Sequence, residues 1–195
     1  MLRRLLQLYI GLVLYGVSTA LFVHANLGAD PWDVFHLGVA KQLGISFGTV
    51  IILTGAAVLL LWIPIRQMPG LGTVSNVIVL GLAADATLAV PPPLESLVAR
   101  SVLLVGAIVL NAIATGMYIG AGFGPGPRDG LMTGLHARTG WSLRGIRTAI
   151  ELTVLVIGWL LGGKFGVGTV IYALSIGPLI QLCLPWFSRP VTRKA

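Results

Sequence analysis

Charged residues and cysteines are scarce in this chain of 195 residues. A single cysteine, Cys183, excludes an internal disulfide and any metal site built from several cysteines. Only 10% of the residues are charged, whereas 56% are hydrophobic and the mean hydropathy is +0.93. A soluble domain of this length cannot bury that much apolar surface, because its interior is too small. The composition therefore indicates a chain that lipid surrounds.

Motifs of common enzyme classes are missing as well. The chain has no Gly-rich phosphate loop, no Gly-x-Ser-x-Gly elbow and no His-Glu-x-x-His helix. Its three histidines do not share the spacing of metal ligands. We therefore expect a protein that is not an enzyme and that has neither a metal nor another cofactor.

Long apolar runs predict six membrane-spanning segments in a single membrane domain, residues 1–195. The segments are residues 5–26, 47–65, 74–90, 98–121, 146–161 and 169–186. The net charge of +7 does not indicate a nucleic-acid partner, because the basic residues stand singly at segment ends and not on one polar face. The predicted surroundings are the lipid bilayer.

The two halves of the chain resemble one another. Asp33 aligns with Asp129, 96 residues further on, and the same shift aligns many other residues without a gap. The matches include Gly28 with Gly124, Pro31 with Pro127, and the sequences GLGTV at 70–74 and GVGTV at 166–170. We therefore divide the chain into repeat 1 (5–90), a linker (91–97), repeat 2 (98–186) and a cytoplasmic tail (187–195).

Each repeat also holds a short element, residues 31–43 or 127–139. Thirteen helical residues reach about 20 Å, less than the roughly 30 Å of the hydrocarbon core. The short elements are therefore expected to be re-entrant or interfacial, which leaves three spans in each repeat. An odd number of spans turns the second repeat upside down, as in many transporters. The alternative, in which the short elements also span, gives eight spans and parallel repeats.

The distribution of Lys and Arg predicts the orientation. With six spans and both termini inside, only Lys41, Arg100 and Lys164 fall outside. The eight-span arrangement also places both termini in the cytoplasm. The third and sixth segments share glycines, such as Gly81 and Gly177, and we expect these segments to pack face to face through them.

The short elements begin with matching sequences, DPWD at 30–33 and GPRD at 126–129. Asp or Gly at the N-cap, Pro at the next position and an acid two residues later are typical of a helix start. One interpretation is purely structural, because lipid makes unsatisfied helix-start amides costly. The other is functional: two half-helices would bring their N-termini together near the membrane midplane and form a binding site. The sequence leaves both open.

The candidate residues for binding a substrate or ion are Asp30, Trp32, Asp33, Asp85, Arg128 and Asp129. Asp85 is included because its repeat counterpart, Gln181, is also polar, which suggests a shared polar lining.

The charges at the two helix starts favour a positive ligand. The aspartates outnumber the single arginine, so we expect a proton, a cation or an amine-bearing solute and not a plain anion. Arg128 can partner its neighbour Asp129, whereas Trp32 cannot do this for Asp33. We therefore expect Asp33 to be protonated more readily than Asp129.

The paired motifs GADPWDVFHLG and GPRDGLMTGL, followed by GVGTVIYALSIGP, resemble the YczE/YitT-like family of bacterial integral membrane proteins. The resemblance covers nearly the whole chain. It implies a plasma-membrane protein of five or six helices, in a family whose biochemical activity is largely undefined.

Two functional hypotheses lead, ahead of a third, an intramembrane aspartyl hydrolase that would use Asp85 with Asp33 or Asp129 but that no known catalytic pattern supports. The first is a small secondary transporter or permease, supported by the inverted repeats and the intramembrane carboxylates. The second is a non-catalytic accessory or solute-recognition subunit of a larger membrane complex, supported by the small size of the chain. A homodimer or a partner membrane subunit is compatible with either.

Overall fold

The computed structural model describes residues 1–90 and 96–188, and these residues form only helices, turns and loops. The predicted linker (91–97) and tail (187–195) therefore lie largely outside the described residues. The eight helices of the described chain are α1 (Leu2–Ala25), α2 (Pro31–Leu43), α3 (Phe47–Ile65), α4 (Leu71–Leu88), α5 (Leu97–Gly120), α6 (Pro127–Thr139), α7 (Leu143–Leu160) and α8 (Val167–Phe187). The all-α class is confirmed, and the two short elements have the predicted bounds.

Helix boundaries follow from local capping chemistry. Asp30 is the N-cap of α2, and its side chain accepts a hydrogen bond from the Asp33 amide; Pro31 is the first helical residue. Ser46 caps α3 in the same way. The short helix α2 ends at Gly44, whose φ of 65° is the left-handed conformation that glycine adopts without strain.

Five helices are long and apolar enough to cross a membrane: α1, α3, α4, α5 and α8. The sequence predicted six spans, and the helix that does not qualify is α7. It carries three charged residues, Arg144, Arg147 and Glu151, all in its N-terminal half. Its apolar C-terminal half accounts for the prediction of a sixth span.

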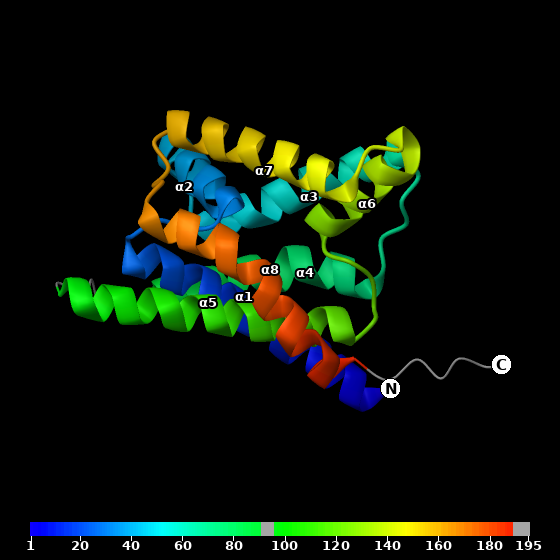
Figure 1. Cartoon of the computed structure of the whole chain (residues 1–195), viewed down its shortest axis with the longest axis horizontal. Helices are drawn as coiled ribbons and strands as arrows, with labels where there is room; N and C mark the ends of the chain where they lie inside the picture. Colours follow the sequence, from blue (N-terminus) through cyan, green and yellow to red (C-terminus); the bar gives the residue numbers. More distant parts are fainter. Residues whose placement is uncertain (91–95, 189–195) are drawn as a thin grey trace.

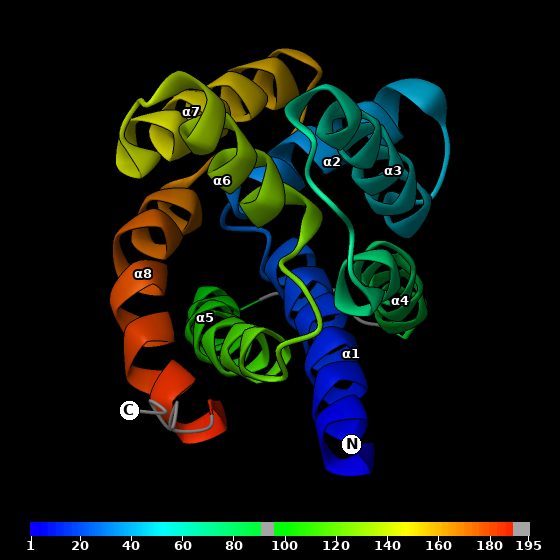
Figure 2. The same ribbon diagram turned by 90° about the vertical axis from the view of Figure 1, so that its right-hand side faces the viewer.

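The helices form two layers around a centre (Figures 1 and 2). In one layer α1 and α5 lie side by side, with α4 packed on α1 and α8 packed on α5. The other layer holds α2 packed on α7 and α3 packed on α6. Buried Asn111 of α5 ties the first layer together: its side-chain amide donates to Ser18 of α1 at 2.9 Å and accepts from Tyr172 of α8 at 3.2 Å.

Contacts between the two halves are reciprocal. The Gly72 amide at the start of α4 donates to the Phe123 carbonyl at 2.8 Å, and the Gly168 amide at the start of α8 donates to the Leu27 carbonyl at 2.8 Å. The residues of the second bond are the repeat counterparts of those in the first. Each half therefore holds the segment that leads into the short helix of the other half.

Two arginines repeat this exchange at the ends of the central helices. Arg4 donates to the Ala121 carbonyl at the end of α5 at 2.9 Å, and its counterpart Arg100 donates to the Ala25 carbonyl at the end of α1 at 2.7 Å. Both bonds satisfy carbonyls that a helix terminus leaves without partners.

The predicted face-to-face packing of the third and sixth segments is wrong. The third segment, α4, packs on α1 and α3. A Cβ atom at Gly81 would lie 2.5 Å from the Gly48 carbonyl oxygen of α3, whereas a Cβ at Gly177 would meet no atom within 4 Å. Gly81 is thus required for close packing of α3 and α4, and Gly177 borders open space.

We therefore expect Gly81→Leu and Gly177→Leu to differ. The leucine at position 81 overpacks a backbone contact and should cost about 1–3 kcal/mol, visible as a lower melting temperature and a reduced folded yield in detergent. The leucine at position 177 should leave both unchanged. Equal loss of folded protein in the two variants would contradict this account of the α3–α4 contact.

Candidate functional site

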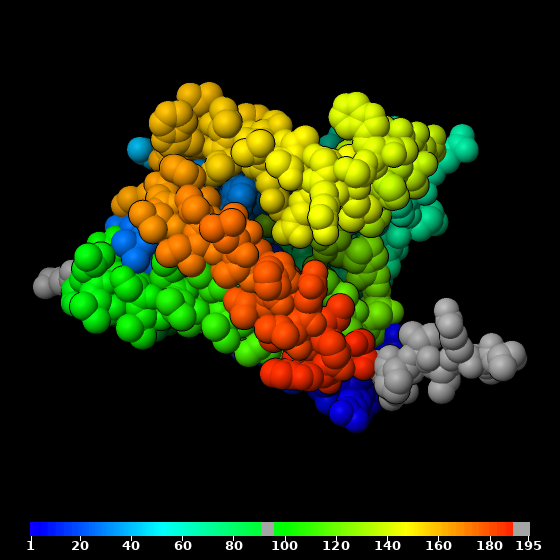
Figure 3. Space-filling view, viewed as in Figure 1, coloured from blue at the N-terminus to red at the C-terminus, as the bar shows by residue number. Residues whose placement is uncertain are grey.

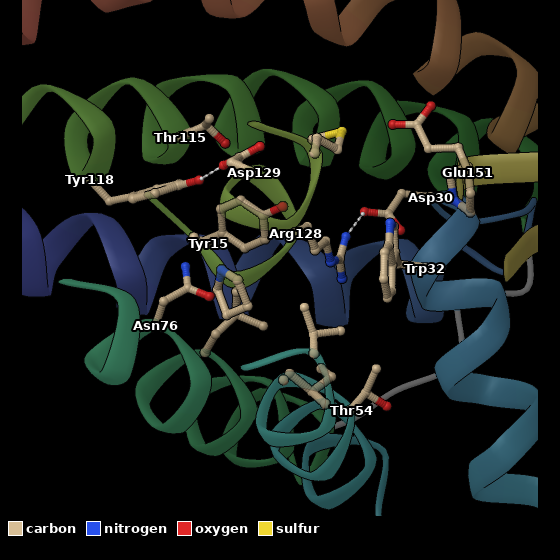
Figure 4. Close-up of a pocket in the computed structure, with 18 of the residues that line it drawn as sticks. Tyr15, Asp30, Trp32, Thr54, Asn76, Thr115, Tyr118, Arg128, Asp129 and Glu151 are labelled. Atoms are coloured by element: carbon tan, nitrogen blue, oxygen red, sulfur yellow. Dashed lines mark hydrogen bonds and ion pairs between the residues drawn. The ribbon is translucent and has the colours of Figure 1, made fainter. Parts of the chain in front are cut away.

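A central cavity of about 230 Å³ lies between the two layers, and all eight helices contribute to its lining. The starts of α2 and α6 both border it (Figure 4). The cavity therefore stands where the sequence repeats predicted that two helix starts meet.

Arg128 of α6 joins the two helix starts. Its guanidinium lies 3.1 Å from an Asp30 carboxylate oxygen and 3.9 Å from an Asp33 carboxylate oxygen of α2. The same guanidinium stacks on Trp32, 4.8 Å from the ring centroid. Four predicted site residues, from motifs 96 residues apart, therefore form one cluster.

Asp30 fits both the structural and the functional interpretation of the DPWD motif. One carboxylate oxygen accepts from the Asp33 amide at 2.7 Å and so caps α2, while the other oxygen contacts Arg128. The predicted capping role is confirmed, and the same side chain also belongs to the charged cluster.

Asp129 does not pair with Arg128, contrary to the sequence-based expectation. Successive side chains of a helix project about 100° apart, so Arg128 faces α2 while Asp129 faces α5. Asp129 accepts a hydrogen bond from the Tyr118 hydroxyl at 2.8 Å (Figure 4). Within the described chain it forms no ion pair with a basic side chain. We had expected Asp33 to be protonated more readily because Arg128 would partner Asp129. That reason is wrong.

Asp33 is 1% exposed and lies behind the cavity lining. One carboxylate oxygen is 3.3 Å from the His36 ring nitrogen, and the other is buried with no hydrogen-bond partner among the described residues. Asp33 thus supports the position of Arg128 from the interior of the protein.

Asp85 lies outside the cavity, so the shared polar lining that we predicted for it is wrong. Its carboxylate accepts from the Gly48 amide at 2.6 Å and from the Ser46 hydroxyl, and it thereby stabilises the start of α3. Its counterpart Gln181 does not line the cavity either. Polar character at equivalent positions had suggested a common role that the helix orientations do not allow.

Sequence analysis missed several lining residues. Tyr15, Tyr118 and Tyr172 bring three phenol rings to the cavity from α1, α5 and α8. A signal existed for Tyr15, which stands well inside an apolar segment, whereas Tyr118 and Tyr172 lie near the ends of their segments. Arg147 and Glu151 form the ion pair that their spacing of four residues favours, at 2.8 Å, but this pair also lines the cavity.

Within the described ranges, no group of three or more His, Cys, Asp or Glu side chains is arranged to hold a metal ion. The chemistry available at the cavity is that of carboxylates, guanidinium groups, phenols, an indole, the His36 imidazole, the Asn76 amide and threonine hydroxyls.

Comparison with known proteins gives the class of the protein. Residues 2–185 match the family of unknown function DUF6198. The chain belongs to the DUF6198 family.

Relatives within curated proteins support this assignment. An uncharacterized protein of Haemophilus influenzae is 36% identical over 93% of this chain and 84% of its own length. The uncharacterized membrane protein YczE of Bacillus subtilis is 30% identical over 91% of this chain and 83% of its own length. The resemblance to YczE inferred from the motifs is confirmed. This DUF6198 protein is thus a multi-pass membrane protein with bacterial relatives, and no solved structure matches it.

Proposed function

We propose that this DUF6198 protein is a small secondary transporter or permease whose binding site is the central cavity. The observation that carries the proposal is the meeting of two helix starts, one from each repeat, through Arg128, Asp30 and Asp33. Discontinuous helices that place charged groups in the protein interior are a recurrent design of transporter sites. Ionisable groups inside a membrane domain are functional candidates, because they are costly there.

The reciprocal contacts of Gly72 and Gly168 support an inverted-repeat arrangement. In this arrangement α2 and α6 re-enter the membrane from opposite faces, and each extended segment before them is held by the other repeat. The proposal takes α7 to cross the membrane like its counterpart α3, so that six spans place both termini in the cytoplasm of a protein that resides in the bacterial plasma membrane.

The charges around the cavity favour a positively charged solute or a proton. Arg128 is already neutralised by two carboxylates, and Arg147 by Glu151. Asp129 remains, and among the described residues its carboxylate is held by the Tyr118 hydroxyl and by no basic side chain. An uncompensated carboxylate attracts a cation strongly where water is excluded. The surrounding aromatic rings add cation–π attraction. Asp129 is therefore the proposed ligand for the solute.

The test is flux through the purified protein in liposomes. Two probes are used: protons, followed with an internal pH dye, and radiolabelled tetramethylammonium, which carries a permanent charge. We expect wild-type protein to carry at least one of them faster than protein-free liposomes do. Asp129→Asn should fold normally and reduce that flux at least tenfold, because asparagine retains hydrogen bonding to Tyr118 and has no charge.

Asp85→Asn is the matched control, since Asp85 is a carboxylate that stabilises the start of α3 outside the cavity. Its flux per folded molecule should equal that of the wild type. Normal flux in Asp129→Asn would remove this residue from the site. Binding of tetramethylammonium without any flux in the wild type would favour the accessory solute-recognition subunit instead.

A further inference from the structure

The two repeats differ most clearly where their third and fourth helices meet. In repeat 1, α3 packs along α4. Their counterparts α7 and α8 are not in extensive contact; α7 packs on α2 and α8 packs on α5. Figure 3 shows a furrow between α7 and α8 on the surface of the molecule.

The side chains explain this difference. Gly48 and Gly55 of α3 face α4, where added Cβ atoms would touch the Gly81 carbonyl and Val77. The equivalent positions of α7 hold Arg144 and Glu151. Small residues allow two helices to approach closely, whereas long charged side chains keep them apart. The open space beside Gly177, the counterpart of Gly81, agrees with a separated pair.

The furrow leads to the cavity. Arg147 and Glu151 on α7 and Tyr172 and Ile176 on α8 all belong to the cavity lining, although the two helices that carry them are not packed together. Arg147 is 45% exposed and Glu151 is 30% exposed, so their ion pair stands at the opening and is accessible from outside. The helices therefore leave a polar passage between the outer surface and the proposed site.

The two helices that border the furrow expose large apolar side chains. Leu152 and Val156 of α7 are 55% and 50% exposed, and Leu174 and Leu182 of α8 are 75% and 66% exposed. Such residues on a membrane protein face acyl chains. A molecule that enters the furrow from the bilayer thus leaves acyl chains and the apolar surfaces of α7 and α8, and reaches the Arg147–Glu151 pair and the Asp129 carboxylate, which line the cavity.

We propose that the furrow between α7 and α8 is a lateral portal, through which an amphipathic cation passes between the bilayer and the cavity. The ligand class is an amine or quaternary ammonium head on an apolar tail: the head reaches Asp129, and the tail stays between the acyl chains and the apolar side chains exposed on α7 and α8. This inference rests on the proposed function for the binding site, the cavity with Asp129, and adds the route by which the solute reaches it.

The test compares two probes with the same head, decyltrimethylammonium and tetramethylammonium, both radiolabelled. The protein is held in nanodiscs of phosphatidylcholine, which has no net charge, and binding rates are measured by rapid filtration. The variant is Gly177→Phe, which narrows the portal from a position where an added Cβ atom meets no atom within 4 Å. The control is Gly106→Phe on α5, where an added Cβ also meets nothing within 4 Å and the residue is exposed. Partition of the decyl probe into lipid is the same in all samples and cancels in the comparison.

We expect Gly177→Phe to slow binding of decyltrimethylammonium at least tenfold and to leave tetramethylammonium binding unchanged, while Gly106→Phe affects neither. Unchanged decyltrimethylammonium binding in Gly177→Phe overturns the portal, as does equal slowing of both probes. A wild-type dimer that Gly177→Phe converts to a monomer also overturns it, by making the furrow a contact between two copies. Failure of either probe to bind the wild type overturns the cationic ligand class. Absence of flux in liposomes, with the expected binding pattern, refutes transport and leaves the portal standing.

Discussion

Replacing Arg128 with glutamine should destabilise the protein by about 3–5 kcal/mol, because removal of one partner leaves buried charges uncompensated. Asp30 and Asp33 are 3% and 1% exposed, and Arg128 is the basic side chain within ion-pair distance of both. Without it, two carboxylates face each other inside the protein and the contact between α2 and α6 is lost. Titration with SDS in mixed micelles measures the loss.

The same variant has a specific rescue. Adding Asp30→Asn and Asp33→Asn to Arg128→Gln removes both carboxylates, and asparagine caps a helix about as well as aspartate does. The triple variant should recover most of the lost stability. Arg147→Gln is the control, because its pair with Glu151 is partly exposed and such pairs contribute about 0–1 kcal/mol. An Arg128→Gln protein as stable as Arg147→Gln would show that the charged cluster does not hold the two helix starts together.

The helix starts at DPWD and GPRD could be predicted because capping is local chemistry. Asp30, Pro31 and Pro127 stand where short-range rules place them, and the structure has both helices within the predicted bounds. The repeat then predicted that these two starts come together, since equivalent elements in duplicated halves tend to occupy equivalent places.

The partners of each side chain could not be predicted in this way. Arg128 and Asp129 are neighbours in sequence, yet the turn of the helix directs them to α2 and α5. Asp85 resembled a site residue because it is a lone carboxylate in an apolar segment, but the neighbouring α3 start lies beside it. Such outcomes depend on helix rotation and packing, which a single sequence does not encode locally.

The membrane count shows a similar limit. The apolar runs in the sequence predict that α7 spans the membrane, as its counterpart α3 does. Arg144 and Glu151 nevertheless interrupt the apolar pattern of α7. Comparison with Gly48 and Gly55 at the equivalent positions would have indicated that α7 cannot pack against α8 as α3 packs against α4.

Trp62 is expected to be the most sensitive apolar residue near the site. It is 1% exposed, packs with Trp32, Val58 and Leu131, and donates its indole N–H to the Pro127 carbonyl at 3.0 Å. Pro127 is the first residue of α6, so Trp62 fixes the helix start that carries Arg128. Trp62→Ala should cost about 3–5 kcal/mol in the SDS titration, since it leaves a large cavity. Trp159→Ala is the control, because that tryptophan is 61% exposed.

A double substitution separates packing against Trp62 from a general loss of apolar surface. The Trp62 ring occupies the space where a Cβ atom of Gly130 would stand, so Gly130→Ala alone should also destabilise the protein, by about 1–3 kcal/mol. In the Trp62→Ala background that space is free, and the added methyl group contacts the walls of the new cavity. We therefore expect Gly130→Ala to be neutral or stabilising there, with a coupling energy of at least about 1 kcal/mol between the two positions. Additive losses would mean that α6 does not rest on the Trp62 ring, and Arg128 would then need another explanation for its position beside Asp30.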